Sequence, residues 1–161
     1  MVPAFDRMQP LAVRHIVVSI LYGHFLLRDA WCDAGDDRES YRDSEGHVAG
    51  ASTYQIVVRA PADPRSVGLE LRVWGGEPEP DRGSWDECRQ LDLHCPTGEL
   101  LVEQITAGAA AEVALPQDAG VYGVRVHRSG YGDAQTFLVD LWWQTPLPPD
   151  DDDEDFYGDL P

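Results

Sequence analysis

The chain has 161 residues, of which 43% are hydrophobic, and this length is enough for one domain with its own core. Its 29 acidic and 12 basic residues give a net charge of -17. Such a charge repels phosphate backbones and anionic lipids, which argues against direct binding to nucleic acid or to a membrane surface. We find no apolar run that approaches the ~20 residues needed to cross a bilayer, no secretory-signal pattern and, among three cysteines, no disulfide framework. These features predict a cytoplasmic protein.

Alternation of apolar and polar residues with a period of two dominates the chain between its termini. The first such stretch, residues 15–27, carries apolar residues on both faces, which predicts one central strand with Gly23 as a candidate bulge. With seven further stretches, about eight strands are expected. Those seven are residues 54–60, 69–73, 90–95, 100–106, 111–115, 122–127 and 137–143.

Turn-forming residues separate these strands, and helical signals are weak. Of the two helix-like windows, residues 29–41 lack a sustained apolar stripe and residues 108–112 are too few. Many short strands with Gly and Pro turns predict an all-β protein, a two-sheet antiparallel β-sandwich of about eight strands. The turns are expected at residues 61–64, 75–76, 96–98 and 129–130.

The last residues differ in composition from the rest. Pro146, Pro148 and Pro149 stop the preceding strand and favour an extended chain. Seven acids and no base follow in the last twelve residues, and removing those seven charges from -17 leaves -10 on the rest. We therefore expect a β-sandwich domain at 1–145 and a solvated, disordered, acidic tail at 146–161.

The string Asp118-Ala119-Gly120-Val121-Tyr122 is similar to the tyrosine corner of Greek-key sandwiches. Asp118 and Gly120 suit a tight turn. Tyr122 then enters a strand, where its ring can be buried and its hydroxyl can bond to the backbone. This predicts an architectural role for Tyr122.

Two acidic segments and the tail are candidate recognition surfaces. Residues 33–45 lack the spacing of a calcium loop, so they form either a solvated loop or an electronegative surface. Residues 77–87 include Trp85 and lie near Trp74. Trp74 is expected in the core, whereas Trp85 could be buried or exposed. Aromatic anchors within a charged rim are typical of interface hot spots. The predicted partner-binding residues are Asp33, Asp36, Asp37, Glu39, Glu77, Glu79, Asp81, Trp85, Asp150, Asp151, Asp152, Asp153, Glu154 and Asp155.

The sequence contains no strong catalytic or metal-binding motif. Cys88, His94 and Cys95 lack the paired spacing of zinc ligands, and adjacent strand residues face opposite sides. We find neither a serine elbow nor a Gly-rich phosphate loop. The candidate histidines for an unrecognised enzyme are His127 and His24. His127 is expected on the exposed polar side of its strand. We expect no enzymatic activity, no cofactor and no metal.

Three segments resemble the competence-nuclease inhibitors of the competence protein J type. Residues 18–29 are similar to the family's first strand, in which an aspartate follows an aromatic-x-x-Phe segment. Residues 113–126 are similar to its late leucine-proline-glycine-x-tyrosine strand entry, and residues 137–143 to its final strand. The acidic loop and the tail depart from the family's pattern. The resemblance implies a small cytosolic protein that binds and blocks a nuclease.

Three functional hypotheses follow. We expect an inhibitor or immunity-type protein whose acidic surface covers the basic cleft of a nuclease or toxin, because such clefts present Arg and Lys to phosphates. The alternative is a β-sandwich adaptor or ligand-binding module, with Trp74, Trp85 or Trp142 at a groove and a tail that only solubilises. The third is an enzyme using His127 or His24. The sequence does not indicate an oligomeric state.

Overall fold

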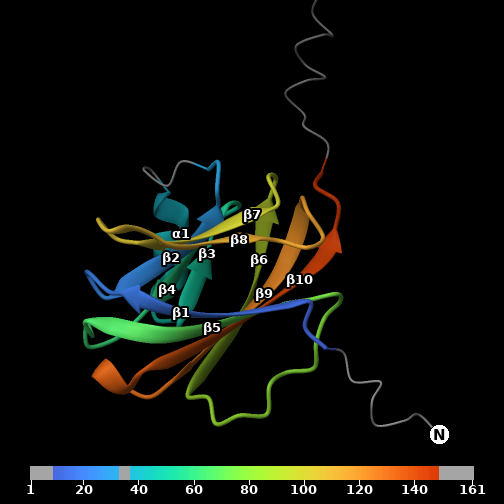
Figure 1. Ribbon diagram of the computed structural model, residues 1–161. Helices are drawn as coiled ribbons and strands as arrows, with labels where there is room; N and C mark the ends of the chain where they lie inside the picture. Colours follow the sequence, from blue (N-terminus) through green and yellow to red (C-terminus); the bar gives the residue numbers. More distant parts are fainter. Residues whose placement is uncertain (1–8, 33–36, 149–161) are drawn as a thin grey trace, which may run out of the picture.

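The structure is a computed structural model, and it describes residues 9–32 and 37–148. Within this part of the chain there are ten strands, one α-helix and a short 3-10 helix (Figure 1). None of the described helices is long and apolar enough to span a membrane. The elements are β1 (Ala12–Ser19), β2 (His24–Asp29), α1 (Arg38–Ser44), β3 (Ala49–Ala51), β4 (Gln55–Arg59), β5 (Ser66–Trp74), β6 (Glu87–Cys95), β7 (Glu99–Gln104), β8 (Gly108–Ala114), β9 (Gly120–Ser129), η2 (Gly132–Ala134) and β10 (Thr136–Thr145).

The strands form two five-stranded sheets, which confirms the predicted all-β sandwich. Sheet A has the order β1-β5-β10-β9-β6, and sheet B has the order β3-β4-β2-β7-β8. Among the pairs of named strands, β5 and β10 are parallel and the others are antiparallel. Strand β10 ends at Thr145, and the acids of the tail lie outside the described residues, so the division into a domain at 1–145 and a tail at 146–161 stays a prediction.

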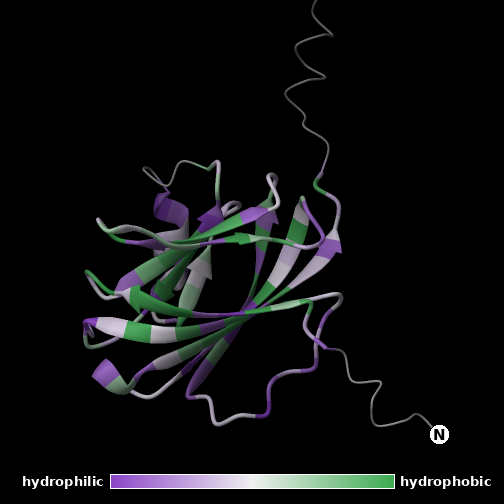
Figure 2. Cartoon of the chain, in the orientation of Figure 1, coloured by the Kyte–Doolittle hydropathy of each residue, from purple (hydrophilic) through white to green (hydrophobic). Residues whose placement is uncertain are grey.

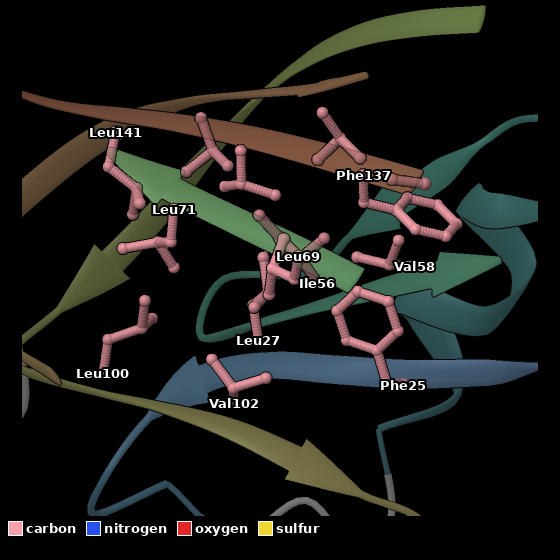
Figure 3. Packing of buried hydrophobic residues seen from close by; sticks show 14 of the residues in the cluster. Phe25, Leu27, Ile56, Val58, Leu69, Leu71, Leu100, Val102, Phe137 and Leu141 are labelled. Carbon is pink, nitrogen blue, oxygen red and sulfur yellow. The ribbon is translucent and has the colours of Figure 1, made fainter. Parts of the chain in front are cut away.

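The core lies between the two sheets. Leu69 and Leu71 of β5 face Leu27 of β2 across the interface, as Figure 3 shows. Phe25 of sheet B meets Phe137 of sheet A edge-to-face, with ring centroids 5.6 Å apart. Hydrophobic and hydrophilic residues alternate along several strands (Figure 2), because successive side chains point to opposite faces of a sheet.

The expectation of one strand over residues 15–27 is wrong. The chain turns at Tyr22 and Gly23, which both adopt left-handed backbone conformations with φ of 58° and 68°. β1 is an edge strand of sheet A, whereas β2 lies in the middle of sheet B. The continuous apolar pattern therefore combines the inward residues of β1 with β2, which is buried on both of its faces.

Two shorter segments also differ from expectation. Residues 108–112, considered as a weak helical window, belong to strand β8. The three-residue strand β3 was not predicted, because Ala49–Ala51 is too short to show alternation. A helix of seven residues, α1, does occur in the region of the other weak window.

Each sheet has a polar segment across its outer face. Helix α1 covers part of sheet B, where Tyr41 contacts His24 and the guanidinium of Arg59. Residues 75–86, here called the strap, connect the end of β5 to the start of β6 and contact sheet A through Pro78 and Trp85. Figure 1 shows the strap as the long yellow-green loop.

The predicted tyrosine corner is present. The Tyr122 hydroxyl donates a hydrogen bond of 2.7 Å to the carbonyl oxygen of Asp118, and the Tyr122 ring is fully buried. Asp118 has a left-handed backbone with φ of 65°, which gives the tight entry into β9. The bond thus fixes the loop between β8 and β9 to the core.

We expect Tyr122→Phe to lower the free energy of unfolding by about 1 kcal/mol, because it deletes one buried hydrogen bond and leaves the ring in place. Urea denaturation measures this. The matched control is Tyr131→Phe, since Tyr131 is 71% exposed. Equal effects of the two changes would contradict the assigned role of the hydroxyl.

Candidate functional site

Several loops meet at one end of the sandwich, uppermost in Figure 1, where β2, β6 and β10 end. We call this the Trp31 end. It comprises residues 30–32 and 37–39 after β2, residues 52–54 before β4, residues 96–99 between β6 and β7, and residues 115–119 before β9. The predicted acids at Asp37 and Glu39 belong to it.

A buried carboxylate holds two of these loops together. Asp29 is fully buried, and its carboxylate accepts hydrogen bonds from the backbone N–H of Trp31 (3.1 Å) and from the Thr97 N–H (3.1 Å) and hydroxyl (2.7 Å). The N–H of Ala30 donates to the carbonyl oxygen of Glu99 at 2.9 Å. The turn after β2 is therefore fixed to the turn between β6 and β7.

Trp31 projects from this fixed turn into solvent and was missed in the sequence analysis. Its side chain is 84% exposed, more than any other large apolar side chain in the described residues. Tyr54, at the same end, is 44% exposed and packs edge-to-face on His94. A tryptophan just beyond a strand and just before a run of acids was the available signal.

The acids of the Trp31 end lack basic partners. Asp37 caps the N-terminus of α1 and accepts hydrogen bonds from Ser40 and Ser52. Glu39, Glu99 and Asp118 are exposed, and none of the three forms an ion pair within the described residues. Asp33, Asp36, Asp150, Asp151, Asp152, Asp153, Glu154 and Asp155 lie outside the described residues, although the chain on both sides of 33–36 and the end of β10 are at this end.

By contrast, two acids of the strap are engaged by sheet A and by the strap itself. Asp81 accepts hydrogen bonds from Trp85 Nε1 (2.7 Å) and the N–H of Gly83 (2.9 Å), and pairs with Arg72 at 3.4 Å. These donors, Trp85 foremost, hold the pKa of the Asp81 carboxyl below its ordinary value. Glu77 lies 3.5 Å from Arg125 Nη2. These two charges are therefore partly neutralised inside the chain.

The strap also buries groups that alternation places on the polar side of sheet A. His127 is only 2% exposed, so the expectation of an exposed strand histidine is wrong. The Trp85 ring lies against it with centroids 5.3 Å apart, and His127 Nδ1 is 3.2 Å from the carbonyl oxygen of Leu138. The half-buried Trp85 is thus a contact of the strap with β9.

Asp140 lies beside this contact and is 1% exposed. Its carboxylate accepts a hydrogen bond of 2.8 Å from Trp74 Nε1, and burial raises its pKa. Trp74 is half-buried on the outer face and is not part of the core cluster, so the core placement expected for it is wrong. Trp142 is buried on the same face beneath the Arg125 guanidinium, 4.9 Å from its ring centroid.

The predicted partner-binding residues therefore fall on separate surfaces. Asp37 and Glu39 lie at the Trp31 end, whereas Glu77, Glu79, Asp81 and Trp85 lie on the strap over sheet A. Of the strap acids, Glu79 is exposed and forms no ion pair within the described part of the chain. Binding through any of these residues stays a prediction.

Catalytic or metal-binding geometry is not assembled around the candidate residues. His24 Nε2 is 2.8 Å from the Tyr41 hydroxyl, and in the described chain neither His24 nor His127 forms a hydrogen bond with a carboxylate. Cys88 is exposed and Cys95 buried, and burial raises the pKa of the Cys95 thiol to about 12. In residues 9–32 and 37–148 no three His, Cys, Asp or Glu side chains are grouped to hold a metal ion.

A cavity of about 840 Å³ opens at the other end of the sandwich. Tyr22 lines it together with the bases Arg59 and Arg128 and the acids Asp63 and Glu87. Arg128 pairs with Glu87 at 3.1 Å. Mixed charges of this kind suit a polar ligand with both donors and acceptors.

We expect Asp81→Asn to lower the free energy of unfolding by about 1–2 kcal/mol at neutral pH, because it weakens charge-assisted hydrogen bonds to the strap. A lowered folded-state pKa means that charged Asp81 stabilises the fold above the unfolded pKa of about 4. That contribution is lost as the pH falls through the folded-state pKa, so the difference between the proteins should shrink there.

Urea denaturation at neutral pH and at about pH 3, below the ordinary carboxyl pKa, measures this difference. Glu79→Gln is the matched control, since the exposed Glu79 has no ion pair among the described residues. A loss that is the same at both pH values, or that Glu79→Gln reproduces, would rule out a structural role for the Asp81 charge.

Two solved structures share this fold. The chain matches the crystal structure of ComJ, inhibitor of the DNA degrading activity of NucA, from Bacillus subtilis, with a TM-score of 0.64 and 13% identity over 86% of this chain and 100% of ComJ. It also matches the product of crocagin biosynthetic gene J, with a TM-score of 0.60 and 15% identity over 83% of this chain and 97% of that one. No protein-family description and no curated protein sequence matches the chain. The resemblance to the competence protein J type is thus supported at the level of the fold.

Proposed function

We propose that the chain is a cytosolic protein-binding inhibitor, without enzymatic activity, that blocks the basic cleft of a nuclease or toxin. The observation that carries the proposal is the fold shared with the whole of ComJ, an inhibitor of a nuclease. The net charge of -17 adds a physical reason, since nuclease clefts are basic in order to bind phosphates.

The proposed mechanism is competition for the cleft. A rigid sandwich holds carboxylates at fixed positions, where they replace the phosphates that the nuclease arginines and lysines otherwise contact. Charge attraction steers the encounter, so association is fast at low ionic strength and slower when salt screens the charges. Of the exposed carboxylates in the described chain, we assign this role to those of the Trp31 end and to Glu79.

The test begins with capture of partners from the native host on the immobilised full-length protein. Purified captured nucleases are then assayed for DNA or RNA cleavage with and without the protein, at ~50 mM and ~300 mM salt, which bracket physiological screening. We expect stoichiometric inhibition that weakens at the higher salt. Failure to inhibit any captured nuclease, or inhibition indifferent to salt, would contradict the proposal.

For the tail we expect an effect on the rate of encounter. Replacing Asp150, Asp151, Asp152, Asp153, Glu154 and Asp155 by Asn or Gln should lower the association rate constant about 10-fold at low salt and change the dissociation rate little. Surface plasmon resonance with an inhibited nuclease measures both rates. A change confined to the dissociation rate would instead place the tail in the bound interface.

A ligand-binding module is the second candidate, and the cavity beside Tyr22 favours it. Its volume of about 840 Å³ is within the range of small-molecule sites. Substituting Arg59 should abolish binding of a metabolite at this cavity without affecting inhibition of a nuclease. Ligand screening by NMR, with shifts mapped to residues 59–63, distinguishes this function from the first.

A further inference from the structure

An exposed tryptophan on a fixed backbone is the unexplained feature of the Trp31 end. Trp31 is 84% exposed, and no ring contact of its indole is found within the described residues. Its backbone N–H is bonded to the carboxylate of Asp29, a side chain with no exposed surface. The same carboxylate holds Thr97, so the backbone of Trp31 is fixed to the turn between β6 and β7.

This arrangement has the properties of an interface hot spot. Hot spots are enriched in tryptophan, and a side chain presented on a pre-ordered backbone loses less entropy when it binds. The exposed part of Tyr54 adds a second aromatic surface at the same end. Tyr131 and Tyr22 are also well exposed, but Tyr131 follows β9 and Tyr22 precedes β2, at the other end of the sandwich.

The charge around Trp31 specifies the kind of partner. Glu39, Glu99 and Asp118 are exposed at this end without ion pairs in the described chain. Arg38 is an exposed base beside Glu39, and Arg28 is paired with Glu103 at 2.7 Å. Exposed acids therefore exceed exposed bases at the described part of the Trp31 end.

From these observations we infer that Trp31 is the anchor of a docking surface for an arginine-rich protein partner. A partner arginine stacks on the indole face, as Arg125 stacks on Trp142 within the chain, and its neighbours pair with the surrounding carboxylates. That the partner is a protein rests on the proposed function, which this inference makes more specific. It assigns the contact to the Trp31 end and leaves the strap outside it.

The test is an NMR titration of the ¹⁵N-labelled full-length protein with a nona-arginine peptide at low salt. The chain has five tryptophans, so five indole N–H signals report on separate places. We expect the largest shifts at the Trp31 indole and at the amides of residues 30–32 and 97–99. The shifts should persist in a full-length variant whose six acids at 150–155 are replaced by Asn or Gln.

Trp31→Ala should weaken peptide binding roughly 2- to 5-fold, the range of an exposed cation–π contact. Tyr131→Ala is the matched control, because it removes an aromatic ring of 71% exposure at the other end, and it should leave binding unchanged. The other four indole signals of Trp31→Ala must keep their positions, which establishes that the variant is folded.

Equal affinities of the two variants, or largest shifts in residues 77–85, would overturn the inference. A nuclease that Trp31→Ala inhibits as well as the unaltered protein would also overturn it while leaving the proposed function in place. If the peptide binds at Trp31 but no nuclease is inhibited, the docking surface stands and the proposed function fails.

Discussion

A shortage of positive charge constrains this structure, since 29 acidic residues share 12 arginines and no lysine. Three arginines of sheet A are used locally. Arg72 pairs with Asp81, Arg125 lies near Glu77, and Arg128 pairs with Glu87. What distinguishes one acidic surface from another is thus whether its carboxylates form ion pairs, and those of Glu39, Glu99 and Asp118 form none within the described residues.

The strap explains how sheet A keeps charged groups away from water. Arg125 is 6% exposed, stacks on Trp142 and donates a hydrogen bond to the carbonyl oxygen of Pro78. Asp140 accepts a hydrogen bond from Trp74 on the same face. Buried charges of this kind are tolerated when they are paired and hydrogen-bonded. Asp81 and Glu77 of the strap are therefore part of the scaffold, which weakens their case as a free recognition surface.

Local signals in the sequence were sufficient for the fold class and for the tyrosine corner. Tyr122 lies four residues after Asp118, so its hydrogen bond depends on a short stretch of chain. Burial of a strand face by a segment distant in the sequence could not be predicted in the same way. His127 was assigned to the correct face of its strand, but only the strap, more than forty residues earlier, makes that face buried.

The candidate site was predictable only in part, because charge is visible in the sequence but exposure depends on the fold. Asp37 and Glu39 are predicted from charge alone, and the fold places them at the same end of the sandwich as the exposed Trp31. Trp31 itself was missed because exposure depends on what packs against a side chain. Asp29 ends the segment that resembles the competence protein J type. In the structure it is the buried acceptor that joins the turns at Trp31 and Thr97.

We expect the surface around Trp31 to be more negative than the strap, because the acids of the Trp31 end form no ion pair within the described residues, whereas Asp81 and Glu77 lie against arginines. Paramagnetic relaxation of amide protons by a cationic and an anionic nitroxide, compared residue by residue, measures the local electrostatic potential of the free protein. We predict a more negative potential at the amides of Trp31 and Thr97 than at those of Gly83 and Trp85. A potential spread evenly over the surface, or most negative on the strap, would contradict it.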